Sequence, residues 1–253
     1  MNLLSVENIS KAFGERIILQ NISFGINKDQ KIAFIAKNGT GKTTLLNIMA
    51  GKDLPDSGQV VFRKGIHIGF LSQNPYFDEE LTVEETIFAT DNPILRLIQT
   101  YEHALQHPEN EDAYQKAFEQ MELHNAWDFE TQYKQILFKL KLDNLQLKVK
   151  NLSGGQKKRL ALANVLISKP DLLILDEPTN HLDMKTKEVL KQALLHYDGT
   201  LILVSHDRDF LDGLVSKVYE FGGGKVTEHL EGIYEFMQRK KLENLKELER
   251  SAS

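Results

Sequence analysis

The stretch that decides the fold reads Ala36-Lys37-Asn38-Gly39-Thr40-Gly41-Lys42-Thr43-Thr44. The residues before it, Lys31–Ala36, predict a β-strand, and a helix is predicted from within the stretch to about Ala50. Gly51 is a typical residue to end that helix. A strand, a glycine-rich loop and a helix in this order are the context that a P-loop (Walker A motif) requires.

The chemistry of this loop predicts a site for ATP and magnesium (Mg2+). Glycines allow backbone N–H groups to turn inward around phosphates, and the helix N-terminus adds partial positive charge. We expect Lys42 to reach the β- and γ-phosphates and the Thr43 hydroxyl to bind magnesium. Ala36 stands where glycine is commoner, which costs about 1 kcal/mol if that residue needs a positive φ. The alternative, a chance turn of glycine and lysine, does not account for the flanking strand and helix.

Two adjacent carboxylates, Asp176 and Glu177, follow a second apolar strand, Leu172–Leu175. In open α/β sheets, ligands bind at the carboxyl ends of the strands. We expect Asp176 to hold magnesium through water, and Glu177 to orient or deprotonate the attacking water. The alternative is a solvated acidic strand end, which is common.

A third motif, Leu152-Ser153-Gly154-Gly155-Gln156, opens a helix predicted to run to about Ser168. Ser153 is a favourable N-cap residue, and the two glycines expose backbone N–H groups. This motif predicts a second anion site in a chain with a single phosphate loop. The alternative is a simple capped turn.

Elsewhere the sequence changes character at Asn92-Pro93. Before this point we expect mostly strands, at Leu3–Ser10, Ile17–Ile26, Gly58–Arg63 and His67–Ser72, with Lys64-Gly65 as the turn between the last two. Helices follow to about Leu142, broken at Pro108 and Asn110, and the third of them covers roughly Ala126–Leu140. After Ser153, helices alternate with short apolar strands, including Leu201–Val204 and Lys217–Phe221, which is typical of a parallel sheet covered on both faces.

Composition bounds the function. The 253 residues carry no signal-like N-terminus and no run of eighteen apolar residues, so we expect neither secretion nor membrane spanning. The absence of cysteine excludes disulfides and thiolate metal sites, and it fits a reducing cytosol. The net charge of −5 gives no global basic field for nucleic acid. Residues 92–135 alone contain eight acidic and three basic residues, 3 − 8 = −5, which indicates a separate acidic helical insertion.

Together the three motifs resemble an ABC-type ATPase domain. The run Ile174-Leu175-Asp176-Glu177-Pro178-Thr179-Asn180-His181-Leu182-Asp183 is similar to the ABC-F subfamily, of which the Uup-like branch is nearest. The resemblance covers nearly the whole chain and implies an α/β fold with a P-loop parallel core sheet, an antiparallel β subdomain and a helical insertion. It divides the chain into a β subdomain with the P-loop core (1–91), a helical subdomain (92–152), the rest of the ATPase core (153–231) and a charged helix (232–253). ABC-F proteins are soluble tandem-domain ATPases acting on ribosomes, so we expect a cytoplasmic location.

The resemblance also assigns roles to single residues. Phe13 matches the aromatic residue that stacks on adenine, with a core phenylalanine as the alternative. Gln73 matches the glutamine that senses magnesium and the γ-phosphate, and His206 matches the histidine that contacts the γ-phosphate. Asp183 matches the aspartate that couples two sites across a dimer. Nucleotide contacts are further implied for Ala36–Thr44 and for Ser153–Gln156, and the magnesium ligands are Thr43, Gln73 and Asp176.

In this family two domains meet head to tail, so that the P-loop of one and the Ser-Gly-Gly of the other enclose each ATP. The expected partners are a second ABC domain, either a missing C-terminal half or a second copy, and the ribosome with its rRNA and tRNA. The helix Gly232–Arg250 resembles the start of an interdomain linker, which suggests an N-terminal domain of a longer protein. Within it, Phe236–Arg250 has five basic and three acidic residues, +5 − 3 = +2, the sign needed near RNA phosphates, although an ordinary solvated helix would fit equally well. The competing interpretations are the ATPase subunit of a membrane transporter and a binding module with incidental hydrolysis.

Overall fold

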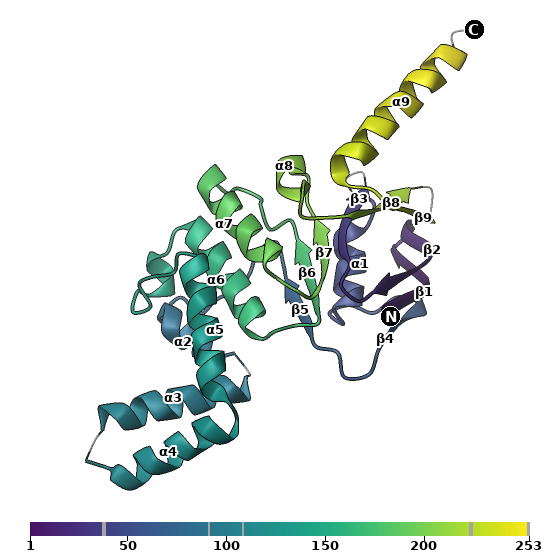
Figure 1. Ribbon diagram of the computed structural model, residues 1–253. Helices are drawn as coiled ribbons and strands as arrows, with labels where there is room; N and C mark the ends of the chain where they lie inside the picture. Colours follow the sequence, from purple (N-terminus) through teal and green to yellow (C-terminus); the bar gives the residue numbers. More distant parts are fainter. Residues whose placement is uncertain (37–38, 91, 108, 223–224, 252–253) are drawn as a thin grey trace. The chain divides into compact units, whose positions relative to one another are not determined.

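The computed structural model describes residues 1–36, 39–90, 92–107, 109–222 and 225–251, with backbone only for residue 225 and residues 243–251. The chain forms two compact units. The first unit comprises Met1–Gln73, Pro170–His181 and Leu194–Ser253, and the second comprises Asn74–Lys169 and Leu182–Ala193. Figure 1 shows the elements of both units along the chain.

The first unit contains all nine strands found in the described residues. Its elements are β1 (Asn2–Phe13), β2 (Arg16–Asn27), β3 (Lys31–Ala36), α1 (Lys42–Met49), β4 (Ser57–Phe62), β5 (Ile68–Leu71), β6 (Leu172–Asp176), β7 (Thr200–Val204), α8 (Arg208–Leu211), β8 (Lys217–Gly222), β9 (Lys225–His229) and α9 (Ile233–Ser251). The second unit is helical. Its elements are α2 (Val83–Phe88), α3 (Pro93–Gln106), α4 (Glu111–Leu123), α5 (Ala126–Lys139), a 3-10 turn η1 (Val149–Asn151), α6 (Gly154–Ile167) and most of α7 (Met184–Leu195).

The larger sheet of the first unit has the strand order β5-β6-β7-β3-β8-β9. All neighbouring pairs are parallel except β8 and β9, which are antiparallel. Every residue of β6 and β7 is buried, because these strands lie inside the sheet and are covered on both faces. The predicted parallel core sheet is therefore confirmed.

A separate three-stranded sheet, β2-β1-β4, is antiparallel throughout. It confirms the expected antiparallel β subdomain. The turn predicted at Lys64-Gly65 is present, but the two strands that it connects do not pair with each other. The strand before it, β4, pairs with β1, while the strand after it, β5, pairs in parallel with β6 from far along the chain. The predicted turn is therefore confirmed, and each of the two strands that it connects pairs with a strand from elsewhere in the chain.

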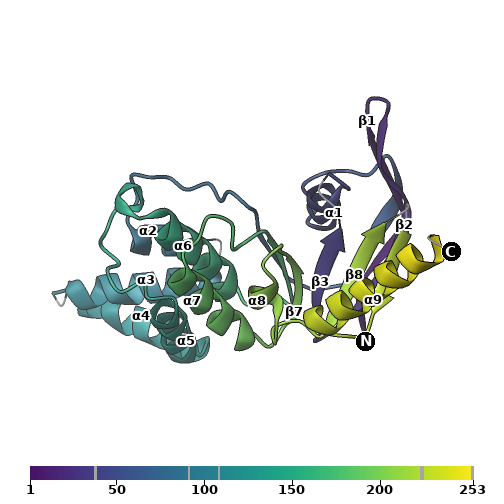
Figure 2. The ribbon, with the colours of Figure 1, turned by 90° about the horizontal axis from the view of Figure 1, so that it is seen from above.

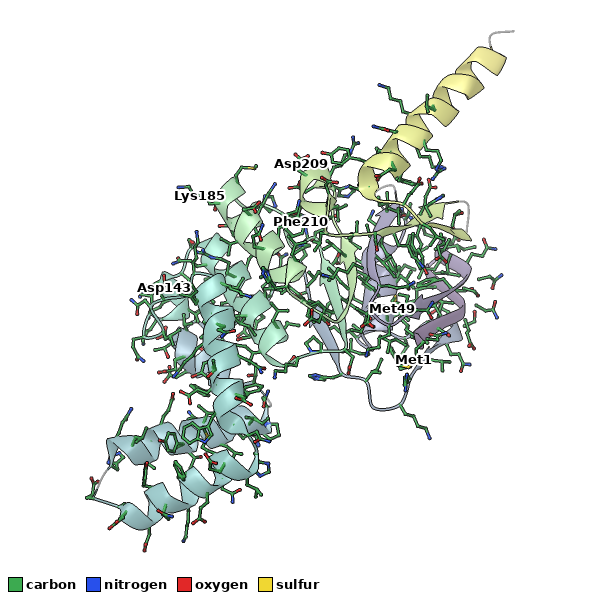
Figure 3. The ribbon with its side chains drawn as sticks, in the orientation of Figure 1. Met1, Met49, Asp143, Lys185, Asp209 and Phe210 are labelled. Atoms are coloured by element: carbon green, nitrogen blue, oxygen red, sulfur yellow. The ribbon has the colours of Figure 1, made fainter. Side chains whose placement is uncertain are left out.

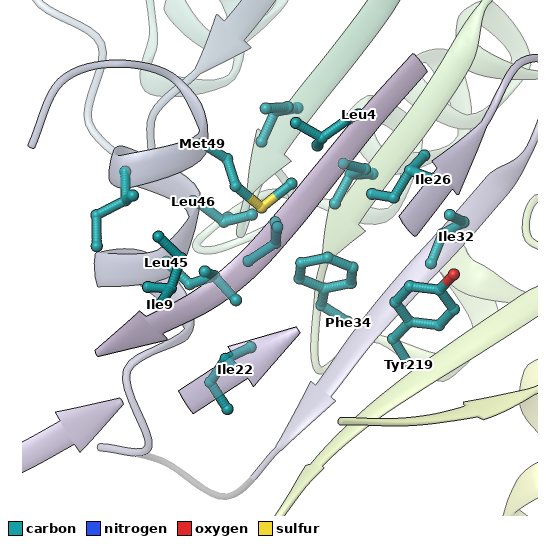
Figure 4. Close-up of a cluster of buried hydrophobic side chains, with 14 of the residues drawn as sticks. Leu4, Ile9, Ile22, Ile26, Ile32, Phe34, Leu45, Leu46, Met49 and Tyr219 are labelled. Atoms are coloured by element: carbon teal, nitrogen blue, oxygen red, sulfur yellow. The ribbon is translucent and has the colours of Figure 1, made fainter. Parts of the chain in front are cut away.

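One hydrophobic core joins the two sheets of the first unit (Figure 4). At its centre the Phe24 ring meets Phe34 edge-on at 5.6 Å between centroids, and Phe34 stacks on Tyr219 at 5.8 Å. The Tyr219 hydroxyl donates to the Gly25 carbonyl at 2.7 Å, so its polar end is satisfied inside the core. Helix α1 packs on the same core with its buried residues Leu45, Leu46, Ile48 and Met49. The helix that follows the phosphate loop is thus fixed to the sheet.

In the second unit, α3, α4 and α5 lie side by side (Figures 1 and 2). The Asn92 side chain caps α3, and the Asn110 side chain caps α4, so the break predicted around Pro108 and Asn110 is confirmed on its described side. Helix α2 was not predicted. It begins with a capping box in which Thr82 and Glu85 bond each other's backbone N–H groups.

Helix α9 contacts the rest of the first unit through its first turns. Arg239 donates to Glu231 and to the His229 ring, and Lys240 Nζ lies 3.0 Å from a Glu220 oxygen. On the other side, the Tyr234 hydroxyl donates to Asp209 of α8, a helix marked by Asp209 and Phe210 in Figure 3. The start of α9 is therefore fixed by polar contacts to β8, the end of β9 and α8.

Candidate active site

Four adjacent strands of the larger sheet end at the same edge and carry the predicted site residues there. The phosphate loop follows β3, His206 follows β7, Asp176 ends β6 with Glu177 directly after it, and Gln73 follows β5. Since these strands are parallel neighbours, their carboxyl ends lie together. Residues that are more than a hundred positions apart are brought into one place by the strand order.

They line a single cavity of about 480 Å³ in the first unit. Its lining includes the predicted residues Gly39, Gly41, Lys42, Thr43, Thr44, Gln73, Asp176, Glu177 and His206. It also includes Arg16, Ile18, Asn180 and Val204, which were not predicted. The cavity combines an ammonium group, hydroxyls, an amide and two carboxylates, which is the donor set that a magnesium–nucleotide phosphate requires.

The phosphate loop has the backbone that its glycines permit. Gly39 and Gly41 have φ of 74° and 89°, in the left-handed region that glycine tolerates. An added Cβ at Gly41 would stand 2.4 Å from the Ile18 Cγ2 atom, so the position also needs a residue without a side chain. Ala36 is the last residue of β3 and has no positive φ, so the possible penalty for alanine does not arise. Lys37 and Asn38 lie outside the described residues.

Lys42 is the first residue of α1 and turns back over the loop. Its Nζ atom donates to the Ala36 carbonyl at 2.9 Å. Burial lowers the pKa of Lys42, while the nearby charges of Glu177 and Asp176 oppose that shift. The ammonium group is thus held between the loop and the two carboxylates. Thr40 lies apart from the main cavity and lines a smaller one of about 260 Å³ with Gly39 and Arg16.

Glu177 is held in an unusual conformation beside His206. Its φ is 47°, in the left-handed region, and its backbone N–H donates to the Val204 carbonyl at 2.9 Å. Its side-chain Oε1 lies 3.3 Å from His206 Nε2. The Oε2 atom is buried and has no hydrogen-bond partner among the described residues. An orphaned carboxylate oxygen at the edge of a cavity fits a group that acts on a molecule bound there.

The environment of Glu177 favours its neutral form. Burial raises its pKa, and the nearby Asp176 adds to the rise, whereas His206 and Lys42 act against it. A carboxyl whose pKa moves up from its ordinary value is better suited to accept a proton near neutral pH.

Two buried hydroxyls beyond the cavity were missed by the sequence analysis. Thr179 Oγ1 and Ser205 Oγ lie 3.0 Å apart and join the segments that follow β6 and β7. The Ser205 hydroxyl also accepts from the Asp207 N–H at 3.1 Å. Thr179 lies in the run 174–183 and Ser205 directly precedes His206, but only the pairing of β6 with β7 shows that the two hydroxyls meet.

Phe13 is not among the residues that line the cavity. It ends β1 with 56% of its surface exposed, so the alternative of a core phenylalanine is excluded. Lys11 Nζ lies 5.6 Å from the centre of its ring. Adenine stacking on Phe13 stays a prediction.

The Leu-Ser-Gly-Gly-Gln motif lies in the second unit, at the start of α6. Ser153 caps the helix as predicted: its Oγ accepts from the Gln156 N–H at 3.2 Å, and Gln156 Oε1 accepts from the Ser153 N–H at 2.8 Å. Gly154 is exposed with open space around it. An added Cβ at Gly155 would stand 3.0 Å from the Thr186 hydroxyl, a tight contact that the Thr186 side chain would have to relieve by moving.

Asp183 lies in the same unit, next to this helix start. Its Oδ2 accepts from the Thr186 hydroxyl at 2.7 Å, and its Oδ1 accepts from the Thr186 N–H at 2.9 Å. These hydrogen bonds lower the pKa of Asp183 and keep it charged. Gly155, Thr186 and Asp183 thus form one local cluster.

The parallel sheet and the loop between β3 and α1 define the class of protein: a P-loop α/β domain that binds nucleotide phosphates. A family model described as "ABC transporter" matches residues 19–180, more than half of the chain. The chain therefore belongs to the ABC transporter ATP-binding domain family, whose domains are ATPases that work in pairs.

Curated relatives agree with this family. The chain is 39% identical over 250 residues to an uncharacterized ABC transporter ATP-binding protein, YfmR, of Bacillus subtilis, covering 96% of this chain and 40% of that protein. It is 34% identical over 254 residues to the energy-dependent translational throttle protein EttA of Mycobacterium tuberculosis, covering 96% and 44%. It is 37% identical over 221 residues to EttA of Escherichia coli, covering 83% and 40%. The chain thus spans less than half the length of these relatives.

Solved structures share the fold. An ATP-binding cassette of an ABC transporter in its ADP conformation superposes with a TM-score of 0.66 at 24% identity, covering 91% of both chains. An ATP-binding subunit of an ABC transporter gives a TM-score of 0.69 at 19% identity, covering 95% and 94%. The predicted α/β fold class is confirmed. In the described part of the chain, we find no helix with the length and apolar character needed to cross a bilayer.

Proposed function

We propose that this chain is the ATP-binding and ATP-hydrolysing domain of an ABC-F protein that acts on the ribosome in translation. The observation that carries the catalytic part is the meeting of Lys42, Glu177 and His206 at one cavity. The part concerning the ribosome rests on the similarity to EttA proteins, whose name describes a translational throttle. The finer Uup-like assignment stays a prediction.

In the proposed reaction, Glu177 orients or deprotonates the water that attacks the γ-phosphate. Its buried Oε2 provides the accepting atom, and its raised pKa suits it to take the proton. His206, with its side chain 58% exposed and 3.3 Å from Glu177, is the residue we assign to the γ-phosphate. Lys42 would exchange its bond to the Ala36 carbonyl for the β- and γ-phosphates.

Thr43, Gln73 and Asp176 are the residues we assign to magnesium, which when bound neutralises charge on the β- and γ-phosphate oxygens. All three line the cavity, so the residues present fit the ion. Oxygen ligands in small number are typical of magnesium sites that the substrate phosphates complete.

Each site needs a second ABC domain. Ser153 and Gly154 are exposed at the N-terminus of α6, where backbone N–H groups and the helix dipole favour an anion. We assign Ser153–Gln156 to the γ-phosphate of a partner domain, and Asp183 to the coupling of the two sites. The partner is either the remaining part of a longer protein or a second copy of this chain.

The hydrolysis part is tested by measuring phosphate release from ATP over a range of protein concentrations. If two copies pair, the rate of product formation rises with the square of protein concentration as long as only a small fraction of the protein is dimeric. Lys42→Ala is expected to remove the activity. Strong hydrolysis by a proven monomer would contradict the need for a second domain. The absence of hydrolysis at every concentration, with or without a partner domain, would contradict the proposed ATPase activity.

The ribosomal part is tested by sedimenting purified ribosomes with the Glu177→Gln variant in ATP and in ADP. We expect ATP-dependent sedimentation that Lys42→Ala does not show. The competing function, a transporter subunit, is favoured by the names of relatives such as YfmR, which is called an ABC transporter ATP-binding protein. The absence of sedimentation with ribosomes in ATP would favour the transporter subunit.

A further inference from the structure

The helices α3, α4 and α5 of the second unit carry a closed ring of four aromatic side chains. Tyr101 of α3 meets Trp127 of α5 edge-on at 4.8 Å between centroids and Tyr114 of α4 at 5.8 Å. Phe118 of α4 lies 6.2 Å from Tyr114 and 5.7 Å from Trp127. We call Tyr101, Tyr114, Phe118 and Trp127 the aromatic surface.

These side chains are not the interior of the helical unit. Neighbouring residues such as Ile98 and Met121 are fully buried and fill that interior. In contrast, Phe118 is 36% exposed, and the other three aromatic residues are half-buried. Leu105, one helical turn after Tyr101, is 50% exposed. Aromatic rings of this unit therefore reach solvent at the aromatic surface.

Carboxylates stand at both ends of the aromatic stripe on α4. Glu111, Tyr114, Phe118 and Glu122 follow one another at spacings of three and four residues, so they share one face of the helix. Glu122 accepts a hydrogen bond from the Trp127 indole N–H, which joins the carboxylate directly to the ring of aromatics.

The same side of α5 is also acidic. Glu130 follows Trp127 by three residues on α5, so the two side chains share one face of that helix. Lys134 pairs with Glu130 and lies 3.9 Å from Glu102, so part of this charge is already compensated. Residues 92–135 as a whole remain at 3 − 8 = −5.

We propose that the aromatic surface binds an arginine-rich segment of a partner protein. Guanidinium groups stack on aromatic faces and pair with carboxylates, and this surface offers both at neighbouring positions. Charge decides against the other occupants. Nucleic acid and anionic lipid carry phosphates that this acidic unit repels, and the same region of a second copy would bring the same negative charge.

The single tryptophan of the chain is Trp127, so its fluorescence reports on this surface alone. The probe is a nona-arginine peptide, titrated into the full chain at low salt and at 0.3 M salt. We expect a saturable change in Trp127 emission and an affinity that falls as salt rises. A single-stranded RNA 12-mer is titrated in parallel.

The variants test the contributions of an aromatic ring and of a carboxylate separately. Phe118→Leu is expected to weaken nona-arginine about two- to fivefold, the size of one exposed cation–π contact. Phe138→Leu is the matched control, since Phe138 on α5 is 77% exposed and lies outside the aromatic surface. Glu111→Gln is expected to weaken binding by a similar factor, and its control is Asp143→Asn in the same unit.

The helical circular dichroism signal checks that Phe118→Leu stays folded. If Phe118→Leu unfolds, Glu111→Gln still tests the proposal. The proposal is overturned if nona-arginine leaves the Trp127 emission unchanged, or if the variants and their controls weaken binding equally. It is also overturned if the RNA binds more tightly than the peptide. Hydrolysis of ATP plays no part in the readout, so this proposal and the proposed function fail separately.

Discussion

Replacing Glu177 with glutamine is expected to remove catalysis and to stabilise the fold at the same time. Glu177 has only 8% of its surface exposed, and its Oε2 has no partner among the described residues. An unsatisfied buried polar atom costs about 1 to 3 kcal/mol, and more when it is charged. The amide keeps the shape without the charge, so we expect unfolding to become harder by about 1 to 2 kcal/mol at pH 7.5.

The sign of the pH dependence follows from the raised pKa of Glu177. Protonation stabilises the folded state, so this contribution is present below the unfolded pKa of about 4.3 and is lost as pH rises through the folded pKa. The parent protein is therefore at a disadvantage at pH 7.5, and the glutamine variant is not. The difference between them should vanish below about pH 4.

The assay is thermal unfolding of the parent and of Glu177→Gln at pH 7.5 and pH 4, together with phosphate release from ATP. A gain of 1 to 2 kcal/mol raises the melting temperature by about 2 to 8 °C in a domain of this size. Loss of a general base lowers hydrolysis by about 10²- to 10⁴-fold. The control is Glu80→Gln, because lysine contacts lower the pKa of Glu80 and its amide should bring no gain. A less stable Glu177→Gln, or one that hydrolyses ATP at the parent rate, would refute the reasoning.

Three further substitutions test other parts of the structure. Ser153→Ala removes the cap of α6 and should lower the free energy of unfolding by about 0.5 to 2 kcal/mol, measured by urea denaturation. Gly41→Ala would place a Cβ 2.4 Å from a neighbouring isoleucine and should weaken binding of a fluorescent ATP analogue at least about tenfold, because the loop must shift. Gly51→Ala, also at positive φ but in open space, should bind the analogue normally. Arg239→Ala should speed hydrogen exchange in the first turns of α9, whereas the exposed Lys241→Ala should not.

Each of these has a contradicting result. An unchanged denaturation midpoint for Ser153→Ala would mean that the cap contributes nothing measurable. Equal nucleotide affinity for Gly41→Ala and Gly51→Ala would mean that the close approach at Gly41 is unimportant. Equal exchange rates for the parent and Arg239→Ala would mean that other contacts fix α9.

The sequence was most informative where the signal is local. Strand β3 was predicted with its observed bounds, and the cap of α6 was predicted from Ser153 alone. The capping box of α2 was equally local, since Thr82 and Glu85 are three residues apart, and it could have been found by the same rule. Strand β9 gave no such signal, because all its residues except Val226 are polar, and it is identified only by its pairing with β8.

The site was predictable as a set of residues but not as a geometry. Asp176 and Glu177 stood out because they follow four aliphatic residues, and the parallel sheet implied that such strand ends meet. The left-handed backbone of Glu177 and the contact between Thr179 and Ser205 could not be foreseen. Both depend on which strands are neighbours, and that information is spread over the whole chain.

The backbone conformation of the segment after β6 affects which substitutions selection can favour there. Glu177 and His181 both have positive φ, at 47° and 61°, which costs about 1 kcal/mol for each residue that is not glycine. Glycine or asparagine at Glu177 would relax the chain but would discard its carboxylate. A laboratory screen for heat resistance alone should therefore accumulate substitutions in this segment, and a parallel screen for ATP turnover should reject the same clones. The positions where the two screens disagree would locate the working part of the molecule without any bound ligand.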